Sequence, residues 1–194
     1  MGVPPLNPAP MTVAEFLAFT DTRPDEEKWE LIEGEPILNA TPSDFHQQIV
    51  SNLIFFLGLA ERQQERSWKA IPGIGVRVSD TNLPQPDVII RPKEAPRGNP
   101  MSRECDDIIV AFEILSPSTR DRDLRWKRNA YMTLPSLMHY VVIAQDAVEV
   151  VVFGRESRFP DRRLNRLDDS LDLATLGISL PLAEICRGTG LAER

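Results

Sequence analysis

The chain has 194 residues, of which 42% are hydrophobic and 26% charged, and it carries a formal net charge of −7. This length suits one domain with a sizeable core, and the composition is that of an ordinary globular protein, neither disordered nor membrane-embedded. The acidic balance argues against a protein that coats nucleic acid by bulk charge. It does not exclude an enzyme that acts on nucleic acid, because a metal site needs local carboxylates and bound metal ions offset negative charge.

The sequence lacks the marks of a membrane span, a secretion signal or a disulfide framework. No apolar run approaches the roughly 18 residues that a membrane span needs. The first ten letters, MGVPPLNPAP, have neither the basic stretch nor the apolar core of a signal peptide. Cys105 and Cys186 are the only cysteines and show no CxxC spacing, so we expect neither a zinc cluster nor disulfides. We therefore expect a cytoplasmic protein with no membrane partner.

The N-terminal part of the chain predicts a lead-in, a short helix, a hairpin and a long helix. Residues 1–11 are expected to form a flexible lead-in, since the first ten contain four prolines and no apolar periodicity. Thr12 and Glu15 fit a capping box, which predicts a short helix that begins after Thr12. Residues 29–38 predict two short strands joined by a Gly turn. Apolar residues recur at three and four over 43–66, which predicts one amphipathic helix.

The rest of the chain predicts a sheet. One helix is expected at 121–133, and the tail at 171–186 predicts a short strand followed by a helix begun at Pro181. The runs at 108–115 and 138–144 are nearly continuous in apolar residues, as in central strands covered on both faces. We therefore expect residues 12–194 to form a single α/β domain, a mixed sheet flanked by helices. The expected strands are β-branched or apolar runs at residues 68–71, 75–78, 87–91, 108–115, 138–144 and 148–153.

Two carboxylates stand among the apolar residues of the expected strands. Asp87 opens a strand directly after Pro86, and Glu113 lies inside the apolar run at 108–115. An ionised carboxylate within a central strand is costly unless a cation compensates it. A hard divalent cation such as Mg²⁺ fits, since it takes a few carboxylate oxygens, waters and substrate phosphate. Each acid also has a simpler interpretation: Asp87 as a strand-start residue that caps backbone amides, and Glu113 as the partner of a buried arginine.

Residues around these acids follow one another in an order typical of a known family. The pattern consists of Pro86-Asp87, the letters EILSPSTR from Glu113 to Arg120, and then Asp123, Lys127 and Tyr131, with WELIEGE at 29–35 and His46 adding to it. It resembles the Uma2 family of endonucleases, within the PD-(D/E)XK restriction-endonuclease-like superfamily, over roughly residues 12–153. The resemblance implies a restriction-endonuclease-like core, Asp87 and Glu113 as metal-binding acids, Mg²⁺ or Mn²⁺ as the cofactor, and a homodimer.

One position departs from the superfamily pattern. The superfamily lysine follows the acid by two residues, where this chain has Leu115 on the same strand face as Glu113. We predict that Lys127 substitutes for it, because the helix after the Glu113 strand can bring Lys127 back toward the metal. An ordinary solvated lysine is the alternative, since Asp121 and Asp123 dilute the positive charge. The surrounding basic cluster, which fits a phosphate backbone beside the site, consists of Arg120, Arg122, Arg125 and Arg128.

Three further residues are candidates for the site. Glu30 matches the family position of an acid from the N-terminal hairpin, whereas Glu33 and Glu35 are more simply turn and surface charges. His46 is a candidate for contact with phosphate or water, and a structural role at the helix start is equally compatible with its position. Arg120 is predicted to contact the substrate.

The leading hypothesis is a metal-dependent endonuclease that acts on DNA, with Asp87, Glu113, Lys127 and Glu30 as its catalytic residues. The alternative is a nucleic-acid-binding module that kept the nuclease fold and lost activity, which Leu115 and the acidic net charge favour. A third hypothesis is a structural protein whose acids form ion pairs alone. Metal binding and metal-dependent cleavage distinguish the three.

Overall fold

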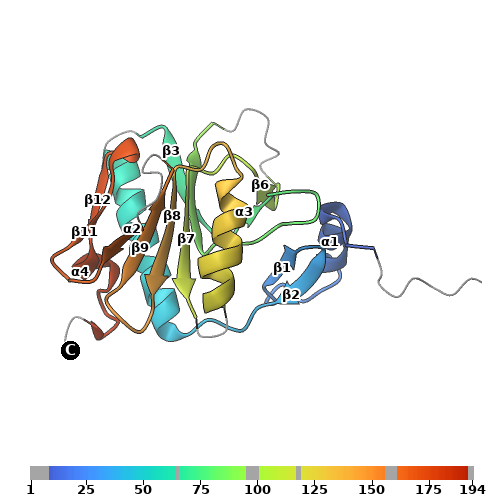
Figure 1. The fold of residues 1–194 in the computed structure, drawn as a ribbon, viewed down its shortest axis with the longest axis horizontal. Helices are drawn as coiled ribbons and strands as arrows, with labels where there is room; N and C mark the ends of the chain where they lie inside the picture. Colours follow the sequence, from blue (N-terminus) through green and yellow to red (C-terminus); the bar gives the residue numbers. More distant parts are fainter. Residues whose placement is uncertain (1–8, 64–65, 95–100, 117–118, 156–160, 192–194) are drawn as a thin grey trace, which may run out of the picture.

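The computed structural model describes residues 9–63, 66–94, 101–116, 119–155 and 161–191. Residues 1–8 of the predicted lead-in lie outside the described residues. At the last residue of the lead-in, the backbone N–H of Met11 donates to Gly34 O at 3.0 Å. Figure 1 shows a central sheet between the long helix α2 (Asp44–Gln63) on one face and the helix α3 (Arg128–Met132) on the other. The layers are therefore those of a sheet flanked by helices, as predicted.

The central sheet is mixed and has six strands. They are β3 (Trp68–Pro72), β5 (Val88–Pro92), β7 (Val110–Leu115), β8 (His139–Ala144), β9 (Val150–Gly154) and β10 (Arg162–Leu164). Their order is β10-β9-β8-β7-β5-β3, in which β7 and β8 are parallel and every other neighbouring pair is antiparallel. Every residue of β7 is buried, which explains its continuous apolar run. A parallel pair needs a crossover, and the helix α3 lies in it.

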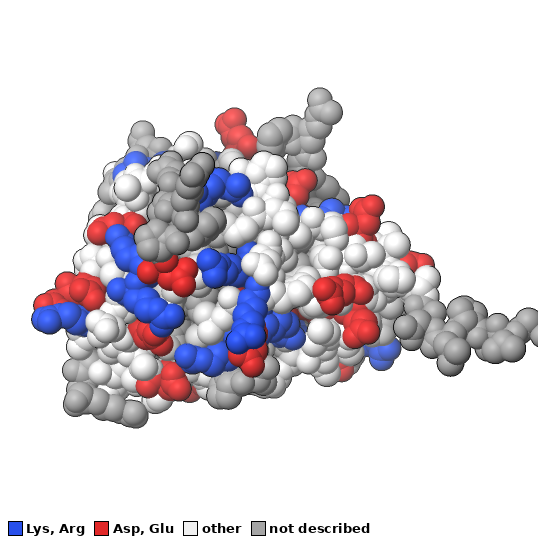
Figure 2. Space-filling model, in the orientation of Figure 1, with Lys and Arg blue, Asp and Glu red and all other residues white. Residues whose placement is uncertain are grey.

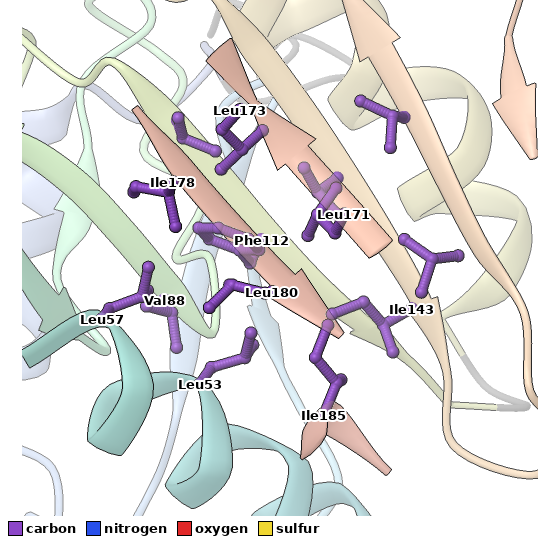
Figure 3. Close-up of a cluster of buried hydrophobic side chains, with 14 of the residues drawn as sticks. Leu53, Leu57, Val88, Phe112, Ile143, Leu171, Leu173, Ile178, Leu180 and Ile185 are labelled. Atoms are coloured by element: carbon purple, nitrogen blue, oxygen red, sulfur yellow. The ribbon is translucent and has the colours of Figure 1, made fainter. Parts of the chain in front are cut away.

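One face of the sheet packs on α2 and on the C-terminal part of the chain. The tail forms a hairpin of β11 (Ser170–Leu173) and β12 (Ile178–Pro181), followed by α4 (Leu182–Ile185). Figure 3 shows how Leu53 and Leu57 of α2, Phe112 of β7 and Leu180 of β12 meet in one apolar cluster. This cluster holds the sheet against its helical layer.

The crossover between β7 and β8 carries the helix predicted at 121–133. It contains a π-helix, η1 (Arg122–Lys127), and continues as α3. Asp123 and Lys127 of η1 are buried, and so is Tyr131 of α3. The sequence predicts a helix here, without any signal for its π-helical part. A π-helical segment is rare and often marks a functional site.

The N-terminal elements confirm the predicted capping box and hairpin. Helix α1 (Val13–Thr20) begins after Thr12, whose N–H donates to Glu15 Oε2 at 2.8 Å while Glu15 N donates to Thr12 Oγ1 at 3.3 Å. Strands β1 (Trp29–Ile32) and β2 (Glu35–Leu38) pair antiparallel. Their turn needs Gly34, because its φ is 79° and a Cβ there would come within 2.4 Å of Pro10.

The structure also corrects several predicted elements. The strand expected at 75–78 is the two-residue β4 (Gly75–Val76), which pairs with β6 (Glu104–Cys105), a strand that was not predicted. Strand β10 was not predicted either. In the tail, the expected single strand is a hairpin that encloses the 3-10 helix η2 (Ala174–Leu176), and the final helix begins at Leu182 after Pro181. These strands are short or exposed on one side, so their apolar signal is weak.

Within the described ranges, none of the helices has an apolar stretch that would reach across a bilayer.

Candidate active site

A cavity of about 290 Å³ lies at the carboxyl ends of the parallel strands β7 and β8. Ser116 directly follows β7 and Gln145 directly follows β8, and both residues line the cavity. The start of the hairpin, residues 39–43 before α2, the start of β5 and η1 supply the other walls. Ligands commonly bind outside the carboxyl ends of parallel strands. The sheet topology therefore places this cavity where a substrate site is expected.

Asp87 and Glu113 stand opposite each other on neighbouring chain segments of the sheet. The register pairs Val88 of β5 with Phe112 of β7, which puts Asp87 across from Glu113. Asp87 N donates to Phe112 O at 3.1 Å, and Ile114 N donates to Asp87 Oδ2 at 2.8 Å. Both acids are buried and line the cavity. The structure thus brings together the two acids that the sequence pattern singled out.

Lys127 lies at the centre of a buried group of acids. Its Nζ is 2.8 Å from Glu30 Oε1, 2.9 Å from Glu113 Oε1 and 3.2 Å from Asp123 Oδ1. Tyr131 Oη also donates to Glu113 Oε1, at 3.1 Å. The side chain of Lys127 is 4% exposed. The ammonium group is therefore the common partner of carboxylates from β1, β7 and η1.

Glu30 connects the N-terminal hairpin to this group. Its Oε1 accepts from Gln85 N at 2.8 Å, and its Oε2 accepts from Asn39 Nδ2 at 3.0 Å. Arg122 Nη2 lies 3.2 Å from the same Oε2 and donates to Asn39 Oδ1 at 2.7 Å. Backbone hydrogen bonds between Leu31 and Leu83 hold β1 against the segment that leads to β5. This pairing carries Glu30 into the cavity.

Three donors surround the carboxylate of Asp87. Lys28 Nζ is 3.0 Å from Oδ1, while Oδ2 takes the Ile114 N–H and lies 3.2 Å from His46 Nε2. His46 comes from the first turn of α2 and is 8% exposed. His46, predicted at the start of the long helix, therefore holds the carboxylate of Asp87 in place.

The two opposed acids have opposite pKa shifts. Burial acts to raise the pKa of Asp87, but the hydrogen bond from His46 and the charge of Lys28 outweigh it and hold the pKa below its usual range. Burial raises the pKa of Glu113 well above its usual range; the charge of Lys127 counteracts this effect, and the neighbouring carboxylates reinforce it. Asp87 is therefore the acid that ionises more readily, and Glu113 is the acid whose ionisation burial opposes and further positive charge would favour.

Lys127 remains a cation in this environment. Burial acts to lower the pKa of Lys127, but the charges of Glu113, Glu30 and Asp123 outweigh it and raise the pKa well above its usual range. Burial likewise acts to raise the pKa of Glu30, but the charge and hydrogen bond of Lys127 outweigh it and lower that pKa. The arrangement suits stabilisation of negative charge by Lys127 and does not suit proton removal by it.

Other predicted site residues lie in different places. Arg120 is exposed and is not among the residues that line the cavity, whereas Arg122 does line it. Glu33 and Glu35 lie outside the lining, and Glu33 Oε1 accepts from Trp126 Nε1 at 3.1 Å. Leu115 packs into an apolar cluster on the Glu113 face of β7, as strand alternation predicts. Among the hairpin acids, Glu30 is the one that reaches the site.

Lys28, Arg122 and Asp123 contact the acids of the site. From the sequence alone, Lys28 was assigned no role, Arg122 was counted only as one arginine of the basic cluster, and Asp123 was noted in the family pattern and as an acid that dilutes that cluster. Asp123 precedes Lys127 by four residues, the spacing at which side chains of a helix meet, so the sequence did indicate that these two residues could contact each other. Lys28 precedes Glu30 by two residues, which favours the same side of an extended strand. No signal separated Arg122 from the other arginines of its helix.

The acids fit a divalent ion of the Mg²⁺ or Mn²⁺ kind. Across the described ranges, no three His, Cys, Asp or Glu side chains form a complete metal-binding group. Mg²⁺ does not need one, since one or two carboxylates, waters and substrate phosphates commonly hold it. The structural support is that Asp87 and Glu113 each already bind an ammonium group in a buried cavity, from Lys28 and Lys127 respectively. Asp87 and Glu113 are the residues that would hold the ion.

Comparisons with known proteins support a nuclease-like fold. A family model described as "Uma2: Putative restriction endonuclease" matches residues 13–183. A solved structure from Anabaena variabilis, described as a putative nuclease belonging to DUF820, is similar with a TM-score of 0.74 and 20% sequence identity. The match covers 91% of this chain and 98% of that chain, and at this identity it shows a shared fold. A comparison with curated proteins finds no match.

Proposed function

Because the chain belongs to the Uma2 family of putative restriction endonucleases, we propose that it is a metal-dependent endonuclease that hydrolyses phosphodiester bonds in DNA. The observation that carries this proposal is the buried pair of Asp87 and Glu113, opposite each other in one cavity, with Lys127 bound to Glu113. Such a pair beside a fixed cation is what metal-assisted phosphodiester hydrolysis needs.

Each residue of the group has a distinct part in the proposed reaction. Asp87 and Glu113 would hold Mg²⁺ or Mn²⁺, which would polarise the phosphate and lower the pKa of a bound water so that this water loses its proton to solvent and becomes a nucleophile. Glu30 fixes Lys127, whose ammonium orients the water and stabilises charge that develops on the phosphate. Lys127 does not remove the proton, because its neighbours raise its pKa. His46 holds Asp87 in place.

Positive charge near the cavity supports a nucleic-acid substrate. Arg122 lines the cavity, and Arg120 is exposed at the same end of the helix. Figure 2 shows Lys and Arg side chains, interspersed with acids, over the face that carries α3, whereas Asp and Glu predominate over the end that carries α1 and the hairpin. Phosphate contacts from such side chains position a nucleic acid without reading its sequence. We assign Arg120 and Arg122 to these contacts.

The test is cleavage of supercoiled plasmid by the purified protein with Mg²⁺ or Mn²⁺. Glu113→Gln keeps the side-chain shape and removes the charge, and Glu35→Gln, at an exposed hairpin acid outside the cavity lining, is the matched control. We expect the wild type and Glu35→Gln to nick and linearise the plasmid and Glu113→Gln to leave it intact. Cleavage by Glu113→Gln, or cleavage that a chelator does not stop, contradicts the proposal.

A second candidate function is nucleic-acid binding without turnover. It is favoured by Leu115, which stands where the superfamily lysine is expected and packs in an apolar cluster. This function predicts a stable complex with plasmid or oligonucleotide and no cleavage with any divalent metal. Metal-dependent cleavage that is lost in Glu113→Gln rules it out.

We further propose a homodimer, as the family resemblance implies. Size-exclusion chromatography with light scattering measures the mass of the species in solution. A mass equal to one chain contradicts the dimer and leaves the nuclease proposal untouched.

A further inference from the structure

We propose that Lys28 is an exchangeable cation of the site: it neutralises Asp87 while no metal is bound and leaves Asp87 when the metal binds. This inference rests on the proposed function, since it concerns the same metal-binding acids. It assigns different roles to the two lysines of the cavity. Lys127 is the permanent cation, and Lys28 is the temporary one.

The contacts of Asp87 identify which donor can leave. The Ile114 N–H and His46 share Oδ2, and Lys28 binds Oδ1, so a metal that approaches the less crowded Oδ1 competes with the ammonium group of Lys28. The Ile114 N–H belongs to the backbone of β7 and is fixed by the sheet. His46 is held in the first turn of α2, and its side chain is 11% exposed. Lys28 binds Oδ1 alone at 3.0 Å, and its side chain is 34% exposed.

Exposure decides between the donors. The Lys28 side chain is one-third exposed on a flexible stem, so its ammonium group can be hydrated by water when it leaves Asp87, and the metal then supplies the charge that the buried carboxylate needs. A buried imidazole and a backbone amide would each be left without a partner inside the protein, which is far more costly. Lys28 is therefore the donor that yields its oxygen.

Lys127 cannot make the same exchange. Its side chain is 4% exposed, and three carboxylates hold its ammonium within 3.2 Å. Its removal would leave these buried acids without their common cation, with Arg122 still beside Glu30, and loss of one partner of a buried ion pair is strongly unfavourable. The metal therefore adds to the charge of Lys127 on the Glu113 side of the cavity and replaces the charge of Lys28 on the Asp87 side.

The released ammonium stays close to the substrate. Lys28 lines the same cavity as Asp87 and Arg122, so its side chain can turn to a phosphate oxygen of the bound strand. Metal binding and phosphate binding are then coupled, because metal binding releases the Lys28 ammonium group and phosphate binding uses it. In the absence of metal, the same lysine supplies positive charge to the buried carboxylate of Asp87, as Lys127 does to Glu113.

The test is direct measurement of Mn²⁺ affinity without nucleic acid, by calorimetry or by the electron paramagnetic resonance signal of free Mn²⁺. Lys28→Met keeps the apolar stem and removes the competing charge, so we expect it to bind Mn²⁺ about two- to fivefold more tightly than the wild type. Lys28→Arg keeps a competing cation and should not bind more tightly than the wild type. Lys93→Met is the matched control: Lys93 is 40% exposed, pairs with Glu61 at 3.4 Å and lies outside the cavity lining.

The outcomes separate this inference from the proposed function. Wild-type binding of Mn²⁺ with an unchanged or weaker affinity in Lys28→Met overturns the role of Lys28 and leaves the metal site standing. Equal tightening in Lys28→Met and Lys93→Met also overturns it, because the effect is then one of net charge. Absence of Mn²⁺ binding to the wild type overturns the metal site itself. Circular dichroism of each variant establishes that the compared proteins are folded.

Discussion

The two faces of β7 have contrasting surroundings. Phe112 and Ile114 point into the apolar core that β7 shares with α2 and the β11–β12 hairpin. Glu113 stands between them in the chain and points to the opposite face, where it contacts Lys127 and Tyr131 beneath the crossover helix. Strand alternation separates the two environments by a single residue. One strand thus contributes to folding through one face and to the candidate site through the other.

This difference shows where the protein tolerates an energetic cost. The apolar face gains stability from burial of hydrophobic surface. On the other face, buried acids surround one lysine, and burial raises the pKa of Glu113 well above its usual range. Buried ion pairs contribute little net stability compared with apolar packing, and strongly shifted pKa values gather at functional sites. The polar face is therefore the one expected to carry the chemistry.

The largest expected effect comes from Lys127→Met, which breaks the polar face. The change leaves Glu30, Glu113 and Asp123 buried without their common cation, so we expect a loss of about 3–5 kcal/mol in the free energy of unfolding. Cleavage should fall by about 10²- to 10³-fold in the folded fraction, because a charge-stabilising group is lost. Urea unfolding and plasmid cleavage measure the two effects.

Two further variants sharpen this prediction. Arg125→Met, at an exposed residue of the same helix outside the cavity lining, should leave both quantities near the wild type. Lys127→Met combined with Glu113→Gln should recover part of the stability and none of the cleavage, because the amide, unlike the acid, does not need the missing cation. A single Lys127→Met variant that is as stable as the wild type would mean that the acids do not depend on this lysine.

The apolar face should respond to Phe112→Ala with a loss of stability alone. Phe112 is 0% exposed in the main core cluster, and truncation of such a ring costs about 3–5 kcal/mol. Molecules that remain folded should cleave at close to the wild-type rate, because the neighbouring Glu113 faces away from the change. Urea unfolding gives the first quantity, and activity per folded molecule gives the second. Phe112→Leu should lose less stability, and equal losses in the two variants would contradict the packing argument.

The elements that carry the site were predictable from strong local patterns. The continuous apolar run of β7 marks a strand covered on both faces, and an acid within that run demands a partner. The proline before Asp87 and the apolar residues after it indicate a second strand beside the first. The position of Lys127 on the helix that follows this strand then made it the candidate cation. These inferences rest on burial and periodicity, which are properties of short segments.

The remaining features depend on tertiary contacts that short segments do not encode. Lys28 and Asp87 are 59 positions apart in the sequence and meet because Leu31 of β1 pairs with Leu83. No local sequence pattern predicts that pairing. The choice of Arg122 over Arg120 as a lining residue depends on how η1 is oriented over the sheet. Strand β12 alternates buried and exposed residues over only four positions, too few for a firm prediction.

The pH dependence of stability offers a smaller and signed test of the polar face. Above the ordinary glutamate pKa of 4.5, an unfolded chain loses the Glu113 proton while the folded protein retains it, since the folded pKa is raised well above that value. Folding stability contributed by this residue therefore falls as the pH rises toward the folded pKa. Glu113→Gln removes the effect, so the free energy of unfolding of this variant should increase relative to that of the wild type as the pH rises. Urea unfolding between about pH 5 and pH 8 measures this difference.

Glu35→Gln provides the reference for that series, because Glu35 is exposed on β2. Its difference from the wild type should stay constant over the same pH range. A Glu113→Gln difference that stays constant over this range, like that of Glu35→Gln, would mean that Glu113 is already ionised in the folded protein at the lower pH. The raised pKa would then be wrong, although the contact with Lys127 could still be present.

The smallest expected effect comes from Tyr131→Phe, which removes one hydrogen bond from the polar face and no packing volume. Tyr131 Oη donates to Glu113 Oε1 at 3.1 Å, and loss of a donor disfavours the ionised carboxylate. The acidic limb of the pH–rate profile for metal-dependent cleavage should therefore move to higher pH, while the rate on the alkaline plateau stays near that of the wild type. Stability should fall by about 1 kcal/mol.

Tyr140→Phe is the matched control for that variant. Tyr140 is also fully buried and its Oη donates to the backbone oxygen of Asp123 at 2.8 Å, so its removal should lower stability by a similar amount. It makes no hydrogen bond to the Glu113 carboxylate, and the acidic limb should stay in place. A shift of the acidic limb by an equal amount in both variants would show that the shift arises from a general destabilisation of the crossover helix. A shift confined to Tyr131→Phe ties the limb to the ionisation of Glu113, because the two variants then differ only in which oxygen has lost its donor.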